Sequence, residues 1–85
     1  MPFRAAPSLA WQLIDGESVI IDLANGRTLG LNPTGSLIWS LLPDHDQAAI
    51  AIEVARRFEV PLTTAQQDVG EFLTSLVERR LIAEA

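Results

Sequence analysis

The fold is decided by residues 19–39, which read VIIDLANGRTLGLNPTGSLIW. The first part is an apolar run that stops at Asn25-Gly26, and Arg27–Leu31 follows. Asn-Gly favours the positive φ angles that a tight hairpin needs. We therefore expect a strand over 18–23, a turn, and a second strand over 27–31.

The same segment leads from the hairpin directly into a helix. Asn32 suits the N-cap position and Pro33 the first helical position. The apolar residues that follow recur at helical spacing, and Pro43 ends the pattern. We expect this helix over 33–42.

On the N-terminal side, the sequence predicts one more strand over 9–14, which turns at Asp15-Gly16 into the strand over 18–23. The three strands would form an antiparallel meander. Residues 1–8 contain two prolines and no periodicity, so we expect a flexible N-terminal arm there. A single domain would then cover residues 9–85.

On the C-terminal side, two further helices are indicated. Residues 47–58 follow Asp46, a candidate cap, and repeat apolar side chains every four residues. Thr63 or Thr64 can cap a third helix that runs to about Arg80. Three strands followed by three helices predict the α+β class, with the helices on one face of a small sheet. The stripes expected to be buried are Ile50, Val54 and Phe58, then Ala65, Val69, Phe72, Leu73 and Leu76.

Composition excludes several classes of function. The 85 residues suffice for one domain, and the net charge of −5 opposes binding to nucleic acid or to an anionic membrane surface. The chain contains no cysteine, so disulfides and thiolate metal sites are impossible, which fits a cytoplasmic protein. We see neither a signal peptide nor an apolar run long enough to span a membrane.

Residues that could carry catalysis are scattered. His45 is the only histidine, and no spacing supplies further metal ligands. No serine is paired with a base by motif, and Gly26–Gly30 lacks the pattern of a phosphate-binding loop. We therefore expect neither enzymatic activity nor a metal or cofactor.

Residues 19–39, with their Leu31-Asn32 and Thr34-Gly35 steps and the Ile38-Trp39 pair, resemble the PqqD-like family. The later segments 68–76 and 80–82 resemble the pattern of that family's third helix, and residues 50–60 match in spacing. The resemblance covers roughly residues 13–82 and rests on the order of several motifs rather than on any single one.

The resemblance implies a winged-helix-like, non-catalytic domain that binds the leader segment of a ribosomally made precursor peptide. Such domains present the leader to modifying enzymes. The turn at Asn25-Gly26 and the Ile38-Trp39 pair look more like the branch of lasso-peptide pathways, which implies a leader protease and a cyclase as partners. The pyrroloquinoline quinone branch is the alternative; its Pro-Glu pair is missing from Val19–Leu23.

The resemblance also implies how a leader binds, namely by antiparallel addition to the third strand, in a cleft beside the third helix. An edge strand offers unpaired backbone groups to an extended peptide, and residues 27–31 contain no proline. Main-chain bonds alone would not suffice, so apolar pockets are needed as well. The residues expected to bind the leader are Arg27, Thr28, Leu29, Gly30, Leu31, Asp68, Glu71, Phe72, Ser75, Leu76 and Arg79.

Each of these residues also has an ordinary structural interpretation. Phe72 and Leu76 have the spacing of core residues that could floor a pocket, while Asp68, Glu71 and Arg79 suit a solvated face. Trp11 and Trp39 we assign to the core or its rim. Two other classes of function stay open: a winged-helix DNA-binding protein, which the charge disfavours, and a weak homodimer formed through the free strand edge.

Overall fold

Three antiparallel strands form the sheet that the sequence predicts, in a computed structural model that describes residues 3–84. They are β2 (Leu9–Ile14), β3 (Glu17–Asp22) and β4 (Arg27–Gly30), in the spatial order β2-β3-β4. The first turn has φ of 51° at Asp15 and 80° at Gly16, and Gly26 has φ of 65°. These left-handed values are the reason for Gly at both turns.

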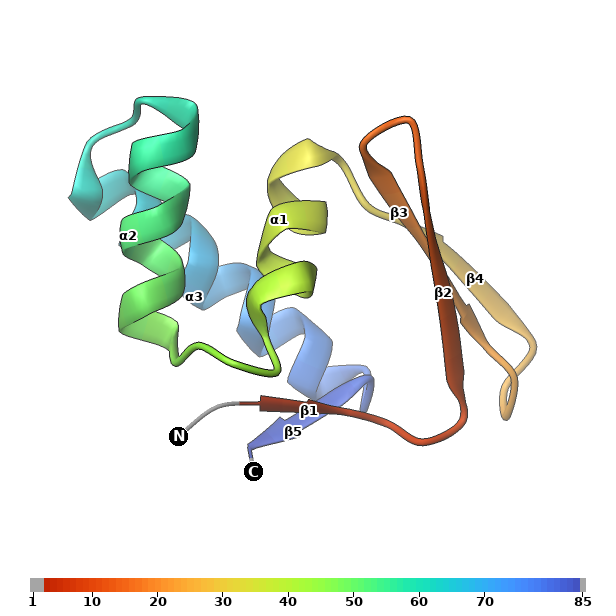
Figure 1. Cartoon of the computed structure of the whole chain (residues 1–85). Coiled ribbons are helices and arrows are strands. Elements are labelled where there is room, and N and C mark those ends of the chain that lie inside the picture. The colour runs from red at the N-terminus through yellow and green to blue at the C-terminus, as the bar shows by residue number, and fades with distance from the viewer. Residues whose placement is uncertain (1–2, 85) are drawn as a thin grey trace.

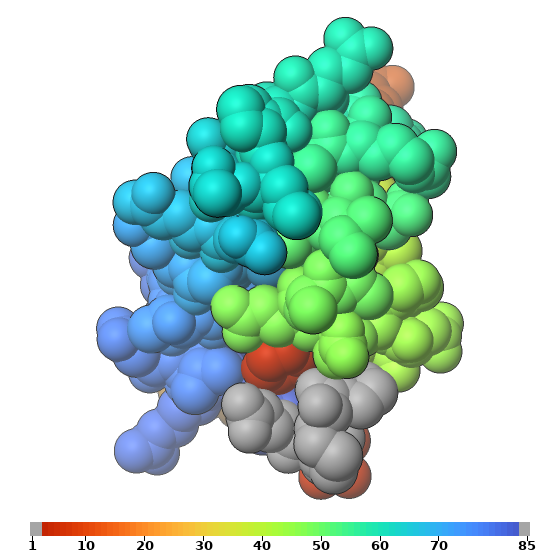
Figure 2. Space-filling view, turned by 90° about the vertical axis from the view of Figure 1, so that its left-hand side faces the viewer, coloured from red at the N-terminus to blue at the C-terminus, as the bar shows by residue number. Residues whose placement is uncertain are grey.

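Three helices follow in the order expected: α1 (Pro33–Leu41), α2 (Gln47–Phe58) and α3 (Leu62–Glu78). Figure 1 shows α1 between the sheet and the other two helices. Figure 2 shows α2 and α3 together forming the side that faces away from the sheet. The α+β class, with a meander followed by three helices, is confirmed.

Two of the three predicted helix caps are confirmed. Asn32 Oδ1 accepts a bond of 2.8 Å from Gly35 N, and Asp46 Oδ1 accepts one of 2.9 Å from Ala49 N. The prediction of a threonine cap for α3 is wrong, because α3 begins at Leu62 without a side-chain cap. The ring of Pro61 holds φ at −57°, which sets up the first turn without a capping side chain.

Two short strands were not predicted. Phe3–Ala5 (β1) pairs antiparallel with Ile82–Glu84 (β5), and both strands contain three residues. Phe3 is buried, so the expectation of a flexible arm is wrong for Phe3–Ala5, while Met1 and Pro2 lie outside the described residues. Strands this short are hard to recognise in sequence, because they contain too few residues to show an alternating pattern.

The core lies where the inner face of the sheet meets the three helices. The largest fully buried side chains come from β3 and from every helix: Ile20, Ile38, Ile50, Val69 and Leu76. Of the predicted stripes, Phe58 and Phe72 are only partly buried and pack against this core. Over residues 3–84, none of the helices has the length and apolar character needed to cross a membrane.

Candidate peptide-binding groove

β4 is an edge strand, because it pairs with β3 on one side only. Leu31 N donates to Ser18 O at 2.8 Å, which identifies Ser18–Leu31 as a hydrogen-bonded position of the ladder. Antiparallel pairing alternates, so Leu29 also turns its backbone groups toward β3. Thr28 and Gly30 therefore point their N–H and C=O groups outward, where an added strand can reach them.

Ser36 holds β4 in place against α1. Its buried Oγ accepts a bond of 2.7 Å from Ser18 N and donates one of 3.2 Å to Leu31 O. The hydroxyl group thus bridges two backbone groups at the end of the β3–β4 ladder. This bridge fixes the end of the edge strand relative to the helices.

A small hollow of about 80 Å³ lies between β4 and the end of α3. Ile20, Leu29 and Leu81 supply its apolar lining, and Asp22, Arg27, Thr28 and Arg79 supply its polar lining. Four of the predicted residues, Arg27, Thr28, Leu29 and Arg79, are thus brought together. The volume suits one side chain of modest size.

Asp22 is a member of this hollow that the sequence analysis missed. Its carboxylate accepts bonds of 2.8 Å from Asn25 Nδ2 and 3.2 Å from Arg27 Nη2. The hydrogen bond from the Asn25 side chain and the neighbouring Arg27 guanidinium lower the pKa of Asp22. Two signals were available: Asp22 lies two residues after the buried Ile20 and so faces the same side of the strand, and Asn25 follows three residues later. Asp22 therefore holds the Arg27 guanidinium at the lining of the hollow.

One stripe of the α3 surface includes Arg79, which lines the hollow beside β4. Asp68, Phe72, Ser75 and Arg79 are spaced by four, three and four residues, which places them on one face of a helix. The Phe72 ring lies so near Gly35 that a Cβ there would come within 3.2 Å of Phe72 Cζ. The half-buried Phe72 thus sits at the junction of α1 and α3.

The remaining predicted residues lie elsewhere. Leu31 and Leu76 are 6% and 1% exposed, so they support the groove from within the core and offer no surface to a guest. Glu71 and Ser75 border a separate open hollow of about 400 Å³, together with Gln47 of α2. Of the four stripe residues, Ser75 is therefore the one that also lines this hollow.

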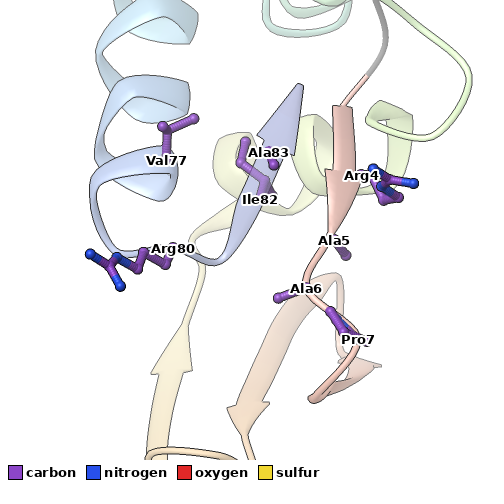
Figure 3. A pocket seen from close by; sticks show the side chains of 8 residues that line it. All are labelled: Arg4, Ala5, Ala6, Pro7, Val77, Arg80, Ile82 and Ala83. Atoms are coloured by element: carbon purple, nitrogen blue, oxygen red, sulfur yellow. The ribbon is translucent and has the colours of Figure 1, made fainter. Parts of the chain in front are cut away.

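A larger open hollow, of about 870 Å³, lies beside β1 and β5. Figure 3 shows that its lining is mostly small or apolar, and that the Arg4 and Arg80 side chains point away from each other. The two guanidinium groups therefore do not converge on a common ligand.

The sequence of this chain was compared with those of known protein families. Residues 17–82 match the family described as coenzyme PQQ synthesis protein D (PqqD). The chain belongs to the PqqD family. The predicted resemblance is thereby confirmed, although among curated proteins none has a significantly similar sequence.

Two solved structures extend this PqqD-family assignment over nearly the whole chain. One is TbiB1 in complex with the TbiA(beta) leader peptide, with 28% identity, a TM-score of 0.88 and 96% of each chain covered. The other is lasso peptide synthetase B1 complexed with the leader peptide, with 31% identity and a TM-score of 0.87. That match covers 98% of this chain and 99% of the other, so β1 and β5 are included in a common fold.

Proposed function

We propose that this PqqD-family chain is a leader-peptide recognition protein of a lasso-peptide pathway. It captures the leader of a ribosomally made precursor by strand addition to β4 and presents it to a leader protease or another modifying enzyme. The observation that carries the proposal is the free edge of β4 beside α3, in a fold shared with two chains solved with leader peptides.

The geometry of β4 suggests how the leader is held. Thr28 and Gly30 each offer one donor and one acceptor, which allows four main-chain bonds at about 1 kcal/mol each. Ordering six to eight leader residues, at about 1–2 kcal/mol each, costs more than these four bonds contribute. Apolar leader side chains must therefore add about 1.5–3 kcal/mol each. Alternate leader side chains would point toward the hollow and toward the α3 stripe of Asp68, Phe72, Ser75 and Arg79.

This function requires no catalysis by the chain itself. We infer a non-catalytic, cytoplasmic protein whose recognition domain comprises the expected residues 9–85 together with the N-terminal strand β1, with chemistry left to the partner enzymes. Residues 3–84 bring together no cluster of three or more metal-ligating side chains. The quinone branch would use the same groove, but both similar structures carry leader peptides and one is named for lasso-peptide synthesis.

The test uses proline to remove one outward donor from β4. A fluorescent leader peptide, taken from the precursor encoded beside this gene, is titrated against wild type and Thr28→Pro. Because the Thr28 N–H points away from β3, the fold should survive, and leader binding should weaken by about tenfold. Leu29→Asp, which changes the lining of the hollow, should weaken binding at least as much.

The matched control is Leu13→Pro, which removes an outward N–H from β2, at the opposite edge of the same sheet. It should bind the leader like the wild type, with folding of all variants checked by circular dichroism. If Thr28→Pro and Leu29→Asp fold and still bind at wild-type strength, the leader does not lie on β4.

A further inference from the structure

The opposite edge of the sheet borders a wider and more apolar groove. This second groove, of about 510 Å³, lies between the β2–β3 hairpin and helices α1 and α2. Its main apolar side chains are Trp11, Leu13, Leu37, Trp39 and Phe58. It shares no lining residue with the hollow beside β4.

Two side chains at this groove are unusually exposed for their size. Trp11 is 51% exposed and Leu13 66%. Trp11 stands edge-on to the buried Trp39, with ring centroids 5.4 Å apart at 82°, so it is held in position while much of its surface stays in water. Apolar side chains fixed at the mouth of a groove are typical of a surface that binds a partner.

The backbone of β2 is also available there. Leu23 N donates to Ser8 O, and the alternation that follows turns Ala10 and Gln12 toward β3. Trp11 and Leu13 therefore direct their backbone groups to the free edge, while their side chains line the groove. Residues 9–14 contain no charge and no proline, the features that commonly protect an edge from pairing.

Among the described residues that line the groove, Arg57 is the only charged one. Glu53, the nearby carboxylate, takes a bond of 2.6 Å from Arg56. Within residues 3–84, Arg57 makes no ion pair of its own. A guest that brings a carboxylate would complement it.

We propose that the second groove docks an extended segment of another protein, with apolar side chains at alternate positions and a carboxylate that meets Arg57. The segment pairs with β2 and places its apolar side chains over Trp11, Leu13 and Phe58. A second copy of this chain fits less well, because the strand it would add, Leu9–Ile14, carries no carboxylate.

Both edges of the sheet can then be occupied together, since β2 and β4 lie on opposite sides of β3. That the segment belongs to an enzyme acting on the precursor rests on the proposed function. The three-stranded sheet would then hold the enzyme segment at β2 and the leader at β4, with only β3 between them.

The experiment uses the full chain and a defined probe, the capped peptide Glu-Thr-Leu-Thr-Leu-Thr-Glu, whose glutamates and leucines share one face of an extended strand. Matched peptides carry lysine or glutamine in place of both glutamates. Because Trp11 and Trp39 both line the groove, tryptophan fluorescence reports its occupation. The acidic peptide should bind the wild type about fivefold more tightly than the neutral one, with the lysine peptide weakest.

Two variants locate the binding. Arg57→Glu should reverse the order of the acidic and lysine peptides, and Leu13→Asp, at an exposed position, should abolish binding of all three. Titration of the leader peptide in parallel should be unaffected by either variant, which separates failure of this inference from failure of the proposed function.

Three outcomes would overturn the proposal. They are the absence of any fluorescence response, equal binding of the acidic and lysine peptides, and an unchanged order with Arg57→Glu. Sedimentation of the chain alone provides one more: a dimer that Leu13→Asp dissociates would assign the groove to a second copy.

Discussion

Single polar side chains join the parts of this small domain, and Ser36 is the central example. Its hydroxyl satisfies Ser18 N and Leu31 O in a buried position where water cannot replace it. Buried donors and acceptors that lose their partner cost more than the bond itself was worth. The end of the edge strand therefore depends on one oxygen atom.

Replacing Ser36 by alanine should lower the free energy of unfolding by about 1–3 kcal/mol, since Ser18 N loses its acceptor. Urea denaturation measures the change. Ser40→Ala is the control, because its exposed hydroxyl bonds only to Leu37 O within α1, and its effect should be well under 1 kcal/mol. Equal effects would mean that the Ser36 bridge does not stabilise the fold.

Asp22 makes the free energy of unfolding depend on pH in the acidic range. Its pKa is lowered in the folded chain by the Asn25 side chain and by Arg27. A lowered carboxyl pKa stabilises the fold above the unfolded value, near 4, and this contribution is lost as the pH falls through the folded pKa. Asp22→Asn should therefore lose less unfolding free energy than wild type between pH 5 and about pH 2.

The measurement is urea denaturation across that pH range. The account of Asp22 is refuted if its asparagine variant has the wild-type pH dependence.

At the scale of the elements, the starts of the helices differ in how they are formed. α1 and α2 begin with side-chain caps at Asn32 and Asp46, whereas α3 begins after Pro61 with none. α1 is only nine residues long, so its capped first turn is a large part of it. Since α1 follows β4 directly, its cap at Asn32 also helps to fix the end of β4, beside which the leader is proposed to bind.

Asn32→Ala should lower the free energy of unfolding by about 1 kcal/mol, because Gly35 N loses its acceptor. Thr63→Ala should change it little, since α3 uses no threonine cap. Thermal unfolding of both variants provides the comparison. A large loss of unfolding free energy with Thr63→Ala would instead show that Thr63 caps α3.

For the whole molecule, β1 and β5 bring the two ends of the chain together beneath the helices (Figure 1). Phe3 packs in the core with Ile82 and Leu81. A domain of 85 residues has little stability in reserve, so this contact matters to the fold although it lies away from β4. The sheet edges and their grooves depend on a core closed by both termini.

Phe3→Ala should therefore lower the free energy of unfolding by about 3 kcal/mol or more. Arg4→Ala, whose side chain is exposed in the same strand, should stay within about 0.5 kcal/mol. Urea denaturation distinguishes the two. If Phe3→Ala were as stable as Arg4→Ala, the N-terminal strand would contribute nothing to the core.

The sequence by itself determined the elements whose signals are local. The turns at Asp15-Gly16 and Asn25-Gly26, the caps of α1 and α2, and the apolar periodicity depend on neighbours within a few residues. The edge position of β4 follows from the order of the elements. The choice of Thr28, Leu29 and Arg79 as leader-binding residues came instead from the resemblance to the PqqD family.

Only the tertiary structure decided which side chains meet. The partner of β1 lies 77 residues away in sequence, the burial of Leu31 and Leu76 depends on what packs over them, and Asp22 reaches the groove through the sheet register. The apolar groove beside β2 likewise joins residues 11 and 58. Contacts between distant segments arise from packing of the whole chain, which no short stretch of sequence encodes.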